Sequence, residues 1–282
     1  MTTAPSTVQH ALTWAQTLGL PRLEAQMLLL HTLDRPLNDR AWLLMNDQSA
    51  LEADTYQHFA HYVQRRLATE PVAYITGVKE FFGLHLQVDA RVLDPRADTE
   101  TLVEWTLSCL ADVPTPQVVD LGTGSGAIAL ALKHSRPDAR VHAVDASTDA
   151  LAVAQANAAQ LSLDVRFHTG SWLSPFDAGL KFDAIVSNPP YIASADVHLA
   201  ALTHEPLSAL ASGTDGLNDL RVIVSQAGQH LQPGGWLLLE HGHDQAQAVQ
   251  DLLSNAGFTQ AQSHADLAGI LRCSGGRWPT MK

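Results

Sequence analysis

The first 72 residues carry apolar side chains at the spacing of amphipathic helices. In the first predicted helix the apolar positions recur every three or four residues, at Val8, Ala11, Leu12, Ala15 and Leu18. Two more such sets lie within residues 23–33 and 53–68. Ser6 or Thr7 can cap the first helix, and Gly19 separates it from the second. This stretch therefore predicts a small helical bundle.

The periodicity changes after Pro71. Residues 74–88 contain two short β-like runs, with glycines at the breaks. Two such runs joined by a glycine-containing turn are typical of a β-hairpin. We therefore expect a helical domain over residues 1–72 and a β-hairpin linker over residues 73–90.

Beyond residue 91, short apolar runs alternate with helical patterns. The predicted strands cover residues 118–121, 140–145, 165–168, 182–187 and 236–240, with two closing strands within 258–278. One predicted helix ends at Leu110, and the others cover residues 127–132, 147–161, 217–231 and 245–256. Because alternating strands and helices favour a parallel sheet with helices on both faces, we expect an α/β domain over residues 91–282. The long loop 192–216 suggests a binding or lid role.

Composition narrows the class of protein. The chain has 282 residues, 46% of them hydrophobic and 16% charged, which is typical of a soluble globular protein of one large or two ordinary domains. No apolar run approaches the ~18 residues that span a bilayer. The first residues lack the basic segment followed by an apolar segment that marks a secretory signal, so we expect a cytoplasmic protein. Cys109 and Cys273 have no C-x-x-C neighbour, so we expect both to be free thiols. The net charge of −12 disfavours nucleic-acid binding.

A glycine-rich turn follows the first predicted strand of the α/β domain. The run V-V-D-L-G-T-G-S-G places Gly122, Gly124 and Gly126 between that strand and a helix. Glycines allow a sharp turn and a close approach to a ligand, and the helix N-terminus adds a positive dipole. The next strand ends in Asp145, and an acid there can bind a ribose diol. An adenosine-containing cofactor is indicated, and this turn leaves both a nicotinamide dinucleotide and S-adenosylmethionine open.

The strand over residues 182–187 leads into Asn188-Pro189-Pro190-Tyr191. Two prolines make a stiff turn, and strand ends of a doubly wound sheet gather at one rim, so this turn should face the glycine loop. The Asn188 side-chain oxygen and the Pro189 carbonyl can accept hydrogen bonds from one planar NH2 group, on which Tyr191 can stack. This arrangement suits methyl transfer to an amide or exocyclic amine, mainly by positioning the nitrogen. The alternative is an ordinary Pro-Pro turn with a capping asparagine.

These motifs carry a family resemblance. The chain resembles the class I S-adenosylmethionine-dependent methyltransferases, which have a Rossmann-like, mostly parallel sheet, through D-L-G-T-G-S-G at 120–126, V-D at 144–145 and S-N-P-P-Y at 187–191. Within that class it is similar to the peptide chain release factor N(5)-glutamine methyltransferases. The narrower likeness rests on E-P-V-A-Y-I-T-G at 70–77, P-R-A-D-T-E at 95–100, E-P-L-S-A-L at 205–210 and L-L-L-E-H-G at 237–242.

The resemblance implies methyl transfer from S-adenosylmethionine to the glutamine amide of the Gly-Gly-Gln loop of release factors, leaving S-adenosylhomocysteine. The helical domain would help to bind the protein substrate, and we expect a monomer. The implied cofactor-binding residues are Gly122, Thr123, Gly124, Ser125, Gly126, Asp145, Trp172 and Asn188. The three glycines would cradle the methionine end, Asp145 would hold the ribose and Trp172 would cover the adenine. The implied substrate-binding residues are Asn188, Pro189, Pro190 and Tyr191, with Asn188, Pro189 and Tyr191 catalytic.

Three positions depart from the family pattern. Asp94 stands where an apolar residue is usual, Ala97 where a second proline is usual, and Ser171 where an acid usually binds the adenine amine. We interpret residues 98–100 as the charged, capped start of a helix rather than as catalytic. Trp172 has the alternative of a surface-loop aromatic.

Several histidines invite a metal-binding interpretation. His198, His204 and Glu205 have no standard zinc spacing, nor do His241 and His243, and methyl transfer needs no metal, so we expect none.

Four other functions compete with the implied one. The nearest are a glutamine methyltransferase acting on a ribosomal protein and an amine methyltransferase acting on nucleic acid, the latter disfavoured by the acidic charge. A non-catalytic cofactor sensor has no use for amide-positioning acceptors. A nicotinamide oxidoreductase would need an acid–base pair for hydride chemistry, and no such pair accompanies the glycine loop.

Overall fold

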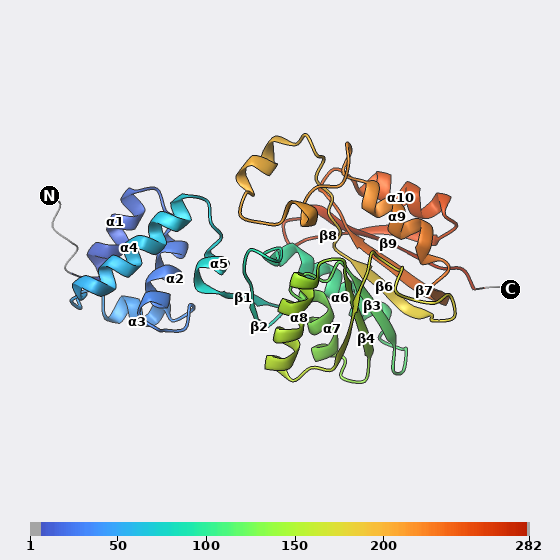
Figure 1. The fold of residues 1–282 in the computed structure, drawn as a ribbon, viewed down its shortest axis with the longest axis horizontal. Helices are drawn as coiled ribbons and strands as arrows, with labels where there is room; N and C mark the ends of the chain where they lie inside the picture. The colour runs from blue at the N-terminus through green and yellow to red at the C-terminus, as the bar shows by residue number, and fades with distance from the viewer. Residues whose placement is uncertain (1–6, 281–282) are drawn as a thin grey trace. The chain divides into compact units, whose positions relative to one another are not determined.

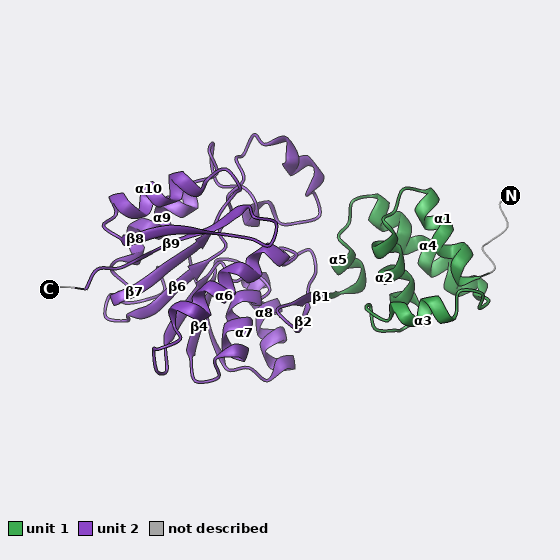
Figure 2. Cartoon of the chain, turned by 180° about the vertical axis from the view of Figure 1, so that it is seen from behind, with its two compact units in different colours: residues 1–78 green, residues 79–282 purple. Residues whose placement is uncertain are grey.

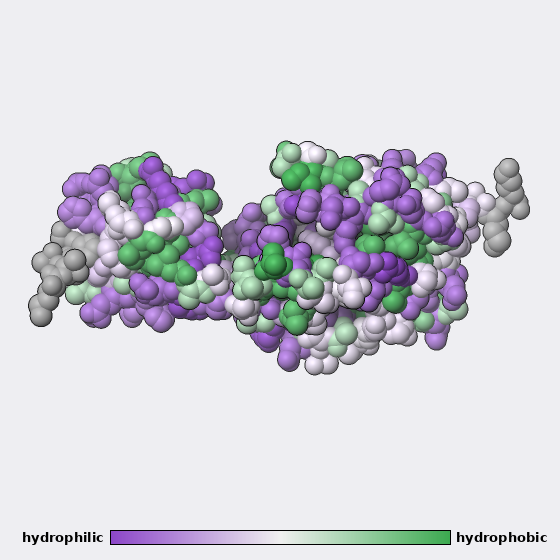
Figure 3. Space-filling view, turned by 90° about the horizontal axis from the view of Figure 1, so that it is seen from above, coloured by the Kyte–Doolittle hydropathy of each residue, from purple (hydrophilic) through white to green (hydrophobic). Residues whose placement is uncertain are grey.

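A computed structural model describes residues 7–280. The chain divides into two compact units, residues 1–78 and residues 79–282 (Figure 2). Each unit has its own buried apolar core. On the face shown in Figure 3, apolar patches interrupt a mostly polar surface in both units. None of the described helices is long and apolar enough to cross a bilayer.

The first unit is helical over its described residues. Its helices are α1 (Val8–Thr17), α2 (Arg22–Thr32), α3 (Arg40–Met45), α4 (Ala53–Leu67) and α5 (Val72–Thr76). The Thr7 hydroxyl caps α1 by accepting from the His10 amide at 3.3 Å, while Ser6, the other proposed cap, lies outside the described residues. The apolar stripes of α1, α2 and α4 meet in one core around Leu29 and Phe59. Helix α3, which is short, was not expected from the sequence.

The junction between the units differs from the predicted linker. Residues 74–76, expected as the start of a hairpin, continue α5, and Ile75 is buried in the core of the first unit. Gly77, with φ of +74°, ends this helix because its left-handed conformation suits glycine. The two-stranded sheet then follows as β1 (Val78–Phe81) and β2 (Leu84–Gln87). The helical unit therefore extends past residue 72.

The second unit is built on a seven-stranded sheet over its described residues (Figure 1). In sheet order the strands are β5 (Val165–Thr169), β4 (Arg140–Asp145), β3 (Gln117–Leu121), β6 (Phe182–Ser187), β7 (Leu231–Glu240), β9 (Leu271–Arg277) and β8 (Thr259–Ala265). The pairs from β5 to β7 are parallel, and β9 runs antiparallel to both of its neighbours. The predicted mostly parallel α/β fold is confirmed. Strand β7 begins five residues before the predicted Trp236, taking in the expected glycine turn.

Helices cover both faces of this sheet. They are α6 (Glu100–Cys109), α7 (Ala127–Ser135), α8 (Thr148–Leu161), α9 (Asn218–Ala227) and α10 (Ala246–Asn255), with single 3-10 turns η1 (Ala97–Thr99), η2 (Val197–Ala201) and η3 (Leu207–Ala209). Val118 packs under α6, α7 and α8, while its neighbour Val119 packs under α9 and α10. Successive strand residues point to opposite faces, so a sheet buried on both sides needs the continuous apolar runs seen in the sequence.

The register of the parallel strands brings four chain segments to one rim. Leu121 pairs with Val144 and with Ser187, and Ser187 pairs with Leu239. Strands β3, β4, β6 and β7 therefore end level with one another. The segments that follow them meet at the carboxyl edge of the sheet, where open α/β sheets bind their ligands.

Candidate active site

The glycine loop wraps over the end of β3. The amides of Gly122 and Thr123 both donate to the Val144 carbonyl, at 2.8 and 2.9 Å, which ties the loop to β4. Gly122 and Gly124 have φ of +71° and +54°. A Cβ on Gly122 would lie 3.3 Å from the Trp172 ring. Because Gly122 has no side chain, the loop backbone can lie this close to the Trp172 ring.

Three other residues of the loop turn toward the protein interior. The Thr123 hydroxyl donates to Asp120 Oδ2 at 2.6 Å, and the Ser125 carbonyl accepts from Asn157 Nδ2 at 2.9 Å. A Cβ on Gly126 would meet Leu130 at 3.0 Å. These residues shape the loop, whereas Gly122 and Gly124 form its exposed wall.

Asp120 holds the glycine loop in place. Its Oδ2 accepts from the Thr123 hydroxyl and, at 3.2 Å, from the Ala129 amide in the first turn of α7. Burial raises the pKa of Asp120 to about 7, and these two hydrogen bonds oppose the rise because they stabilise the carboxylate. One carboxyl group thus holds the strand end, the loop and the helix start together.

Asp145 ends β4 beside the glycine loop. Its Oδ2 accepts from the Gly124 amide and its Oδ1 from the Ser147 amide, both at 2.9 Å. Each carboxylate oxygen can accept a second hydrogen bond, so the group retains capacity for a ligand. The two backbone bonds fix its rotamer.

A cavity of about 310 Å³ opens at this rim. Six of the residues that line it are sites the sequence singled out: Gly122, Gly124, Asp145, Trp172, Asn188 and Pro190. Ser171, at the position where an acid is usual, also lines it. Trp172 has φ of +52°, a conformation that non-glycine residues rarely adopt. The strand ends thus bring the glycine loop, the acid and the asparagine turn to one cavity.

The asparagine turn is anchored on both sides. Asn188 Nδ2 donates to the Thr99 hydroxyl at 3.1 Å, which leaves the amide oxygen of Asn188 available as an acceptor. The Tyr191 carbonyl accepts from Gln245 Nε2 at 3.0 Å, and the Tyr191 hydroxyl lies 3.5 Å from Glu240 Oε1. Among the described residues, Pro189 and Tyr191 are not part of the cavity wall: Pro189 is buried, and the Tyr191 hydroxyl faces the end of β7.

Comparison with known proteins places the chain in a family. A release factor glutamine methyltransferase of Burkholderia pseudomallei is 46% identical over 269 residues, which cover 92% of this chain and 93% of that protein. The Bordetella pertussis protein of the same name is 48% identical over 260 residues, covering 92% and 95%. The chain belongs to the release factor glutamine methyltransferase family.

Domain models agree with this membership, and a solved structure shares the fold. Residues 8–77 match the PrmC N-terminal domain, and residues 98–214 match the methyltransferase small domain. The T. thermophilus 16S rRNA N2 G1207 methyltransferase, solved with AdoMet and guanosine, has a TM-score of 0.53 at 20% identity, covering 71% of this chain and 49% of that one. At that identity the likeness shows the fold alone.

Two buried residues of this family member were missed as site residues by the sequence reasoning. Thr99, interpreted as part of a helix start, does precede α6, but its hydroxyl oxygen accepts from Asn188 Nδ2 instead of capping the helix. Glu240, at the end of β7, is 1% exposed and lies beside Tyr191. Burial raises the pKa of Glu240 to about 7, while the hydroxyls of Thr99 and Tyr191 lower it. The sequence feature that could have identified Glu240 is a polar residue at the end of an apolar strand, as in L-L-L-E.

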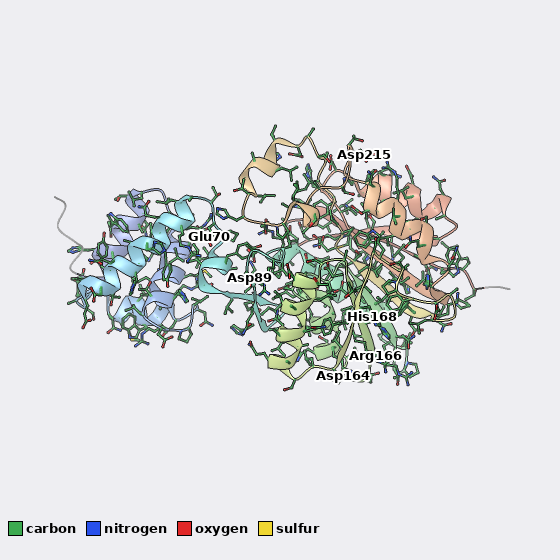
Figure 4. All side chains as sticks on the ribbon, viewed as in Figure 1. Glu70, Asp89, Asp164, Arg166, His168 and Asp215 are labelled. Carbon is green, nitrogen blue, oxygen red and sulfur yellow. The ribbon has the colours of Figure 1, made fainter. Side chains whose placement is uncertain are left out.

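The loop 192–216 is held to the rest of this unit by a buried carboxylate. Glu205, whose side chain is 1% exposed, accepts two hydrogen bonds from Arg96 at 2.9 and 2.6 Å and one from the Asp94 amide at 3.1 Å. Asp94 in turn pairs with Lys79 at 3.1 Å. The unusual acid at position 94 is therefore matched by a nearby lysine. Asp215, labelled in Figure 4, lies near the C-terminal end of this loop and pairs with Arg221 at 2.6 Å.

Replacing Glu205 by alanine should release this loop. The change leaves the partly exposed Arg96 and the Asp94 amide without their carboxylate, so we expect a loss of roughly 1–3 kcal/mol in unfolding free energy. Limited proteolysis should cut within residues 192–216 several times faster than in the unmodified protein. As a control, Glu104→Ala changes an exposed glutamate of α6, outside the loop, and should leave both measurements unchanged. Equal cleavage rates for Glu205→Ala and the control would contradict the anchoring role.

Two of the histidines considered as metal ligands, His198 and His241, have other partners. His198 Nδ1 lies 2.7 Å from Asp196, and the ring nitrogens of His241 lie 2.8 Å from the Gly242 carbonyl and 2.7 Å from the Ser274 hydroxyl. Within residues 7–280, no group of three or more His, Cys, Asp or Glu side chains could hold a metal ion. Glu205 is bound by Arg96.

Proposed function

We propose that this chain transfers a methyl group from S-adenosylmethionine to the side-chain amide nitrogen of the glutamine in the Gly-Gly-Gln loop of peptide chain release factors. The observation that carries the proposal is the orientation of Asn188. Its NH2 group is held by Thr99, so its oxygen can accept a hydrogen bond at a cavity that the glycine loop also lines. Membership of the release factor glutamine methyltransferase family supports the choice of substrate.

The cavity has the features that S-adenosylmethionine requires. Gly122 and Gly124 offer backbone at close range, Asp145 retains acceptor capacity for a ribose, and Trp172 lines the wall where an adenine could lie. We propose these four residues as cofactor-binding. Thr123, Ser125 and Gly126 would contribute by shaping the loop, since they face inward. The bound cofactor supplies an activated methyl group on a sulfonium.

The protein's own contribution is positioning. We propose that Asn188 Oδ1 accepts a hydrogen bond from one N–H group of the substrate carboxamide. The Pro189 carbonyl, expected as the second acceptor, belongs to a buried residue outside the cavity wall. Pro190 makes the turn stiff, and Tyr191 fixes it to β7 and α10 through its hydroxyl and carbonyl. The methylated amide nitrogen is positively charged and loses a proton readily, so the reaction requires no strong base. Holding the nitrogen in line with the methyl group supplies most of the rate enhancement.

We further propose that the two units divide the work. The helical unit, predicted as residues 1–72 and extending to residue 78, would bind the release factor, and the unit from residue 79 would carry out the transfer. The two-stranded sheet of residues 78–87, which is the part of the predicted 73–90 linker that forms a hairpin, would follow the helical unit directly. A release factor as substrate implies a cytoplasmic enzyme. We propose that it acts as a monomer and without direct contact to nucleic acid.

The proposal is tested by incubating the full chain with S-adenosylmethionine and purified release factor. Peptide mass spectrometry should find one added methyl group on the glutamine of Gly-Gly-Gln. A release factor with that glutamine changed to glutamate is the matched control and should gain none. A methyl group appearing only on a ribosomal protein or a nucleic-acid base would replace the proposed substrate. Saturable binding of NADH in place of S-adenosylmethionine would refute methyl transfer altogether.

A further inference from the structure

The side chain of Gln245 joins three chain segments beside the asparagine turn. Its Oε1 accepts from the Gly242 amide at 2.8 Å, and its Nε2 donates to the Tyr191 carbonyl at 3.0 Å and to the Asp215 carbonyl at 3.3 Å. Gln245 holds the N-cap position of α10, where a side chain commonly accepts from the first amides of the helix. All three of these partners lie outside α10. The carboxamide therefore links the segment after β7, the asparagine turn and the end of the loop 192–216.

Only a carboxamide makes these three contacts at once. A glutamine amide has two N–H donors and an acceptor oxygen, and Gln245 uses both donors on backbone carbonyls and the oxygen on a backbone amide. A carboxylate can accept but cannot donate, and an ammonium group can donate but cannot accept. The contacts thus select glutamine for its hydrogen-bonding groups and not for its size, which glutamate shares.

The Tyr191 carbonyl is the contact through which Gln245 can act on Asn188. The two residues of the turn are separated only by Pro189 and Pro190, whose rings fix φ and leave little freedom to absorb a displacement. Gly216 packs so close to the Tyr191 carbonyl that a Cβ there would overlap it. The carbonyl is therefore held on two sides, and a shift of Tyr191 is passed on to Asn188.

The loop 192–216 closes on itself next to this contact. The Ile192 amide donates to the Leu210 carbonyl at 2.9 Å, and the Ser212 amide donates to the Ile192 carbonyl at 2.9 Å. Between these paired ends, the loop supplies three residues of the cavity wall, which are Pro206, Ser208 and Ala209. Gln245 therefore ties the base of a cavity-lining loop to the asparagine turn.

We propose that Gln245 is a positioning residue for methyl transfer: it fixes the Tyr191 carbonyl against the base of the loop and so aligns Asn188 with the substrate amide. The inference rests on the proposed function, because that function gives the Asn188 oxygen its role in binding the glutamine. Loss of the two N–H donors should lower kcat, since the reacting nitrogen is then aligned less well with the methyl group. Cofactor affinity should be kept, because the glycine loop and Asp145 are untouched.

The test compares two variants with the unmodified full chain. Gln245→Glu keeps an acceptor for the Gly242 amide but places a carboxylate against the two carbonyls, and Gln245→Met removes all three hydrogen bonds at similar length. With release factor as substrate, kcat should fall by roughly tenfold or more in Gln245→Glu and by roughly threefold or more in Gln245→Met. The KM for release factor and the dissociation constant of S-adenosylmethionine should each change by less than about threefold, as expected for an interaction that acts in the transition state.

Gln117→Met is the matched control. Gln117 is half-buried at the start of β3, and its Nε2 donates to the Lys181 carbonyl at 3.1 Å. The variant loses a hydrogen bond of the same kind, but at the opposite edge of the sheet from the asparagine turn. It should leave kcat unchanged. Rates are compared per folded molecule, with the folded fraction measured by circular dichroism, so that a loss of stability is not taken for a loss of positioning.

The outcomes separate the inference from the proposed function. If the unmodified chain methylates release factor but either Gln245 variant keeps full kcat, the inference is overturned and the proposed function stands. The same holds if Gln117→Met lowers kcat as much as Gln245→Met, or if the Gln245 variants change only KM or cofactor affinity. If the unmodified chain methylates no release factor, the proposed function fails and the inference fails with it.

Discussion

Replacing Asn188 by alanine is expected to lower the rate of methyl transfer by one to two decades. The variant loses the oxygen that would accept from the substrate amide, and the amide is left one buried partner short. Such a loss costs roughly 1–3 kcal/mol, and each decade in rate corresponds to about 1.36 kcal/mol. Affinity for S-adenosylmethionine should fall less than threefold, because the glycine loop and Asp145 are untouched. Single-turnover kinetics and a cofactor titration measure the two effects separately.

A surface asparagine supplies the control for that experiment. Asn255 lies exposed at the end of α10, away from the rim, and Asn255→Ala should leave rate and affinity unchanged. Full turnover by Asn188→Ala would remove the positioning role of this side chain. A large loss of cofactor affinity in Asn188→Ala would instead assign it to the cofactor.

Replacing Gly216 by alanine is expected to damage both stability and catalysis. Gly216 has φ of +74°, and a Cβ there would overlap the carbonyl oxygen of Tyr191 and lie 2.7 Å from Gln245 Nε2. The obstacle is backbone of the asparagine turn, which cannot move without shifting Asn188. We expect a loss of roughly 2–4 kcal/mol in unfolding free energy, from the strained conformation and the overlap together. Methyl transfer should slow by roughly tenfold or more where the protein is folded.

Two other glycines separate the causes of that effect. Gly269 has φ of +80° with open space around it, so Gly269→Ala should cost about 1 kcal/mol from the backbone conformation alone. Gly179 has neither a positive φ nor a close neighbour, and Gly179→Ala should change stability by less than about 0.5 kcal/mol. Urea denaturation compares the three variants. If Gly216→Ala costs no more than Gly269→Ala, the close approach to Tyr191 is unimportant.

The central strands of the sheet were predictable because each contains a short apolar run bounded by turn residues, which the edge strand β8 (TQAQSHA) does not. Val118 and Val119 face opposite cores. A sheet that is buried on both faces has no solvent-facing positions for alternate polar residues. Residues 74–76 were predicted wrongly for a related reason. A short apolar run fits a strand or a buried helical turn equally well, and packing of Ile75 in the helical unit decided between them.

The site was predictable in part. Gly122, Gly124 and Asn188 follow strands and Asp145 ends one, and the parallel register makes their meeting at one rim nearly obligatory. Nothing in the linear spacing separates Gly122 and Gly124, which line the cavity, from Gly126, which packs against Leu130. Glycine serves both needs because both require the absence of a Cβ.

The sequence by itself determined the fold, the edge of the sheet at which the site lies, and the kind of chemistry that the turn at residues 188–191 suits. These follow from local periodicity and from residues that restrict the backbone. Only the tertiary structure decided the environment behind that turn. Thr99 and Glu240 come from segments far apart along the chain, and only the folded sheet brings Thr99 to Asn188 and Glu240 to Tyr191. Hydrogen-bond direction and buried charge depend on such distant neighbours, so no pattern along the chain can contain them.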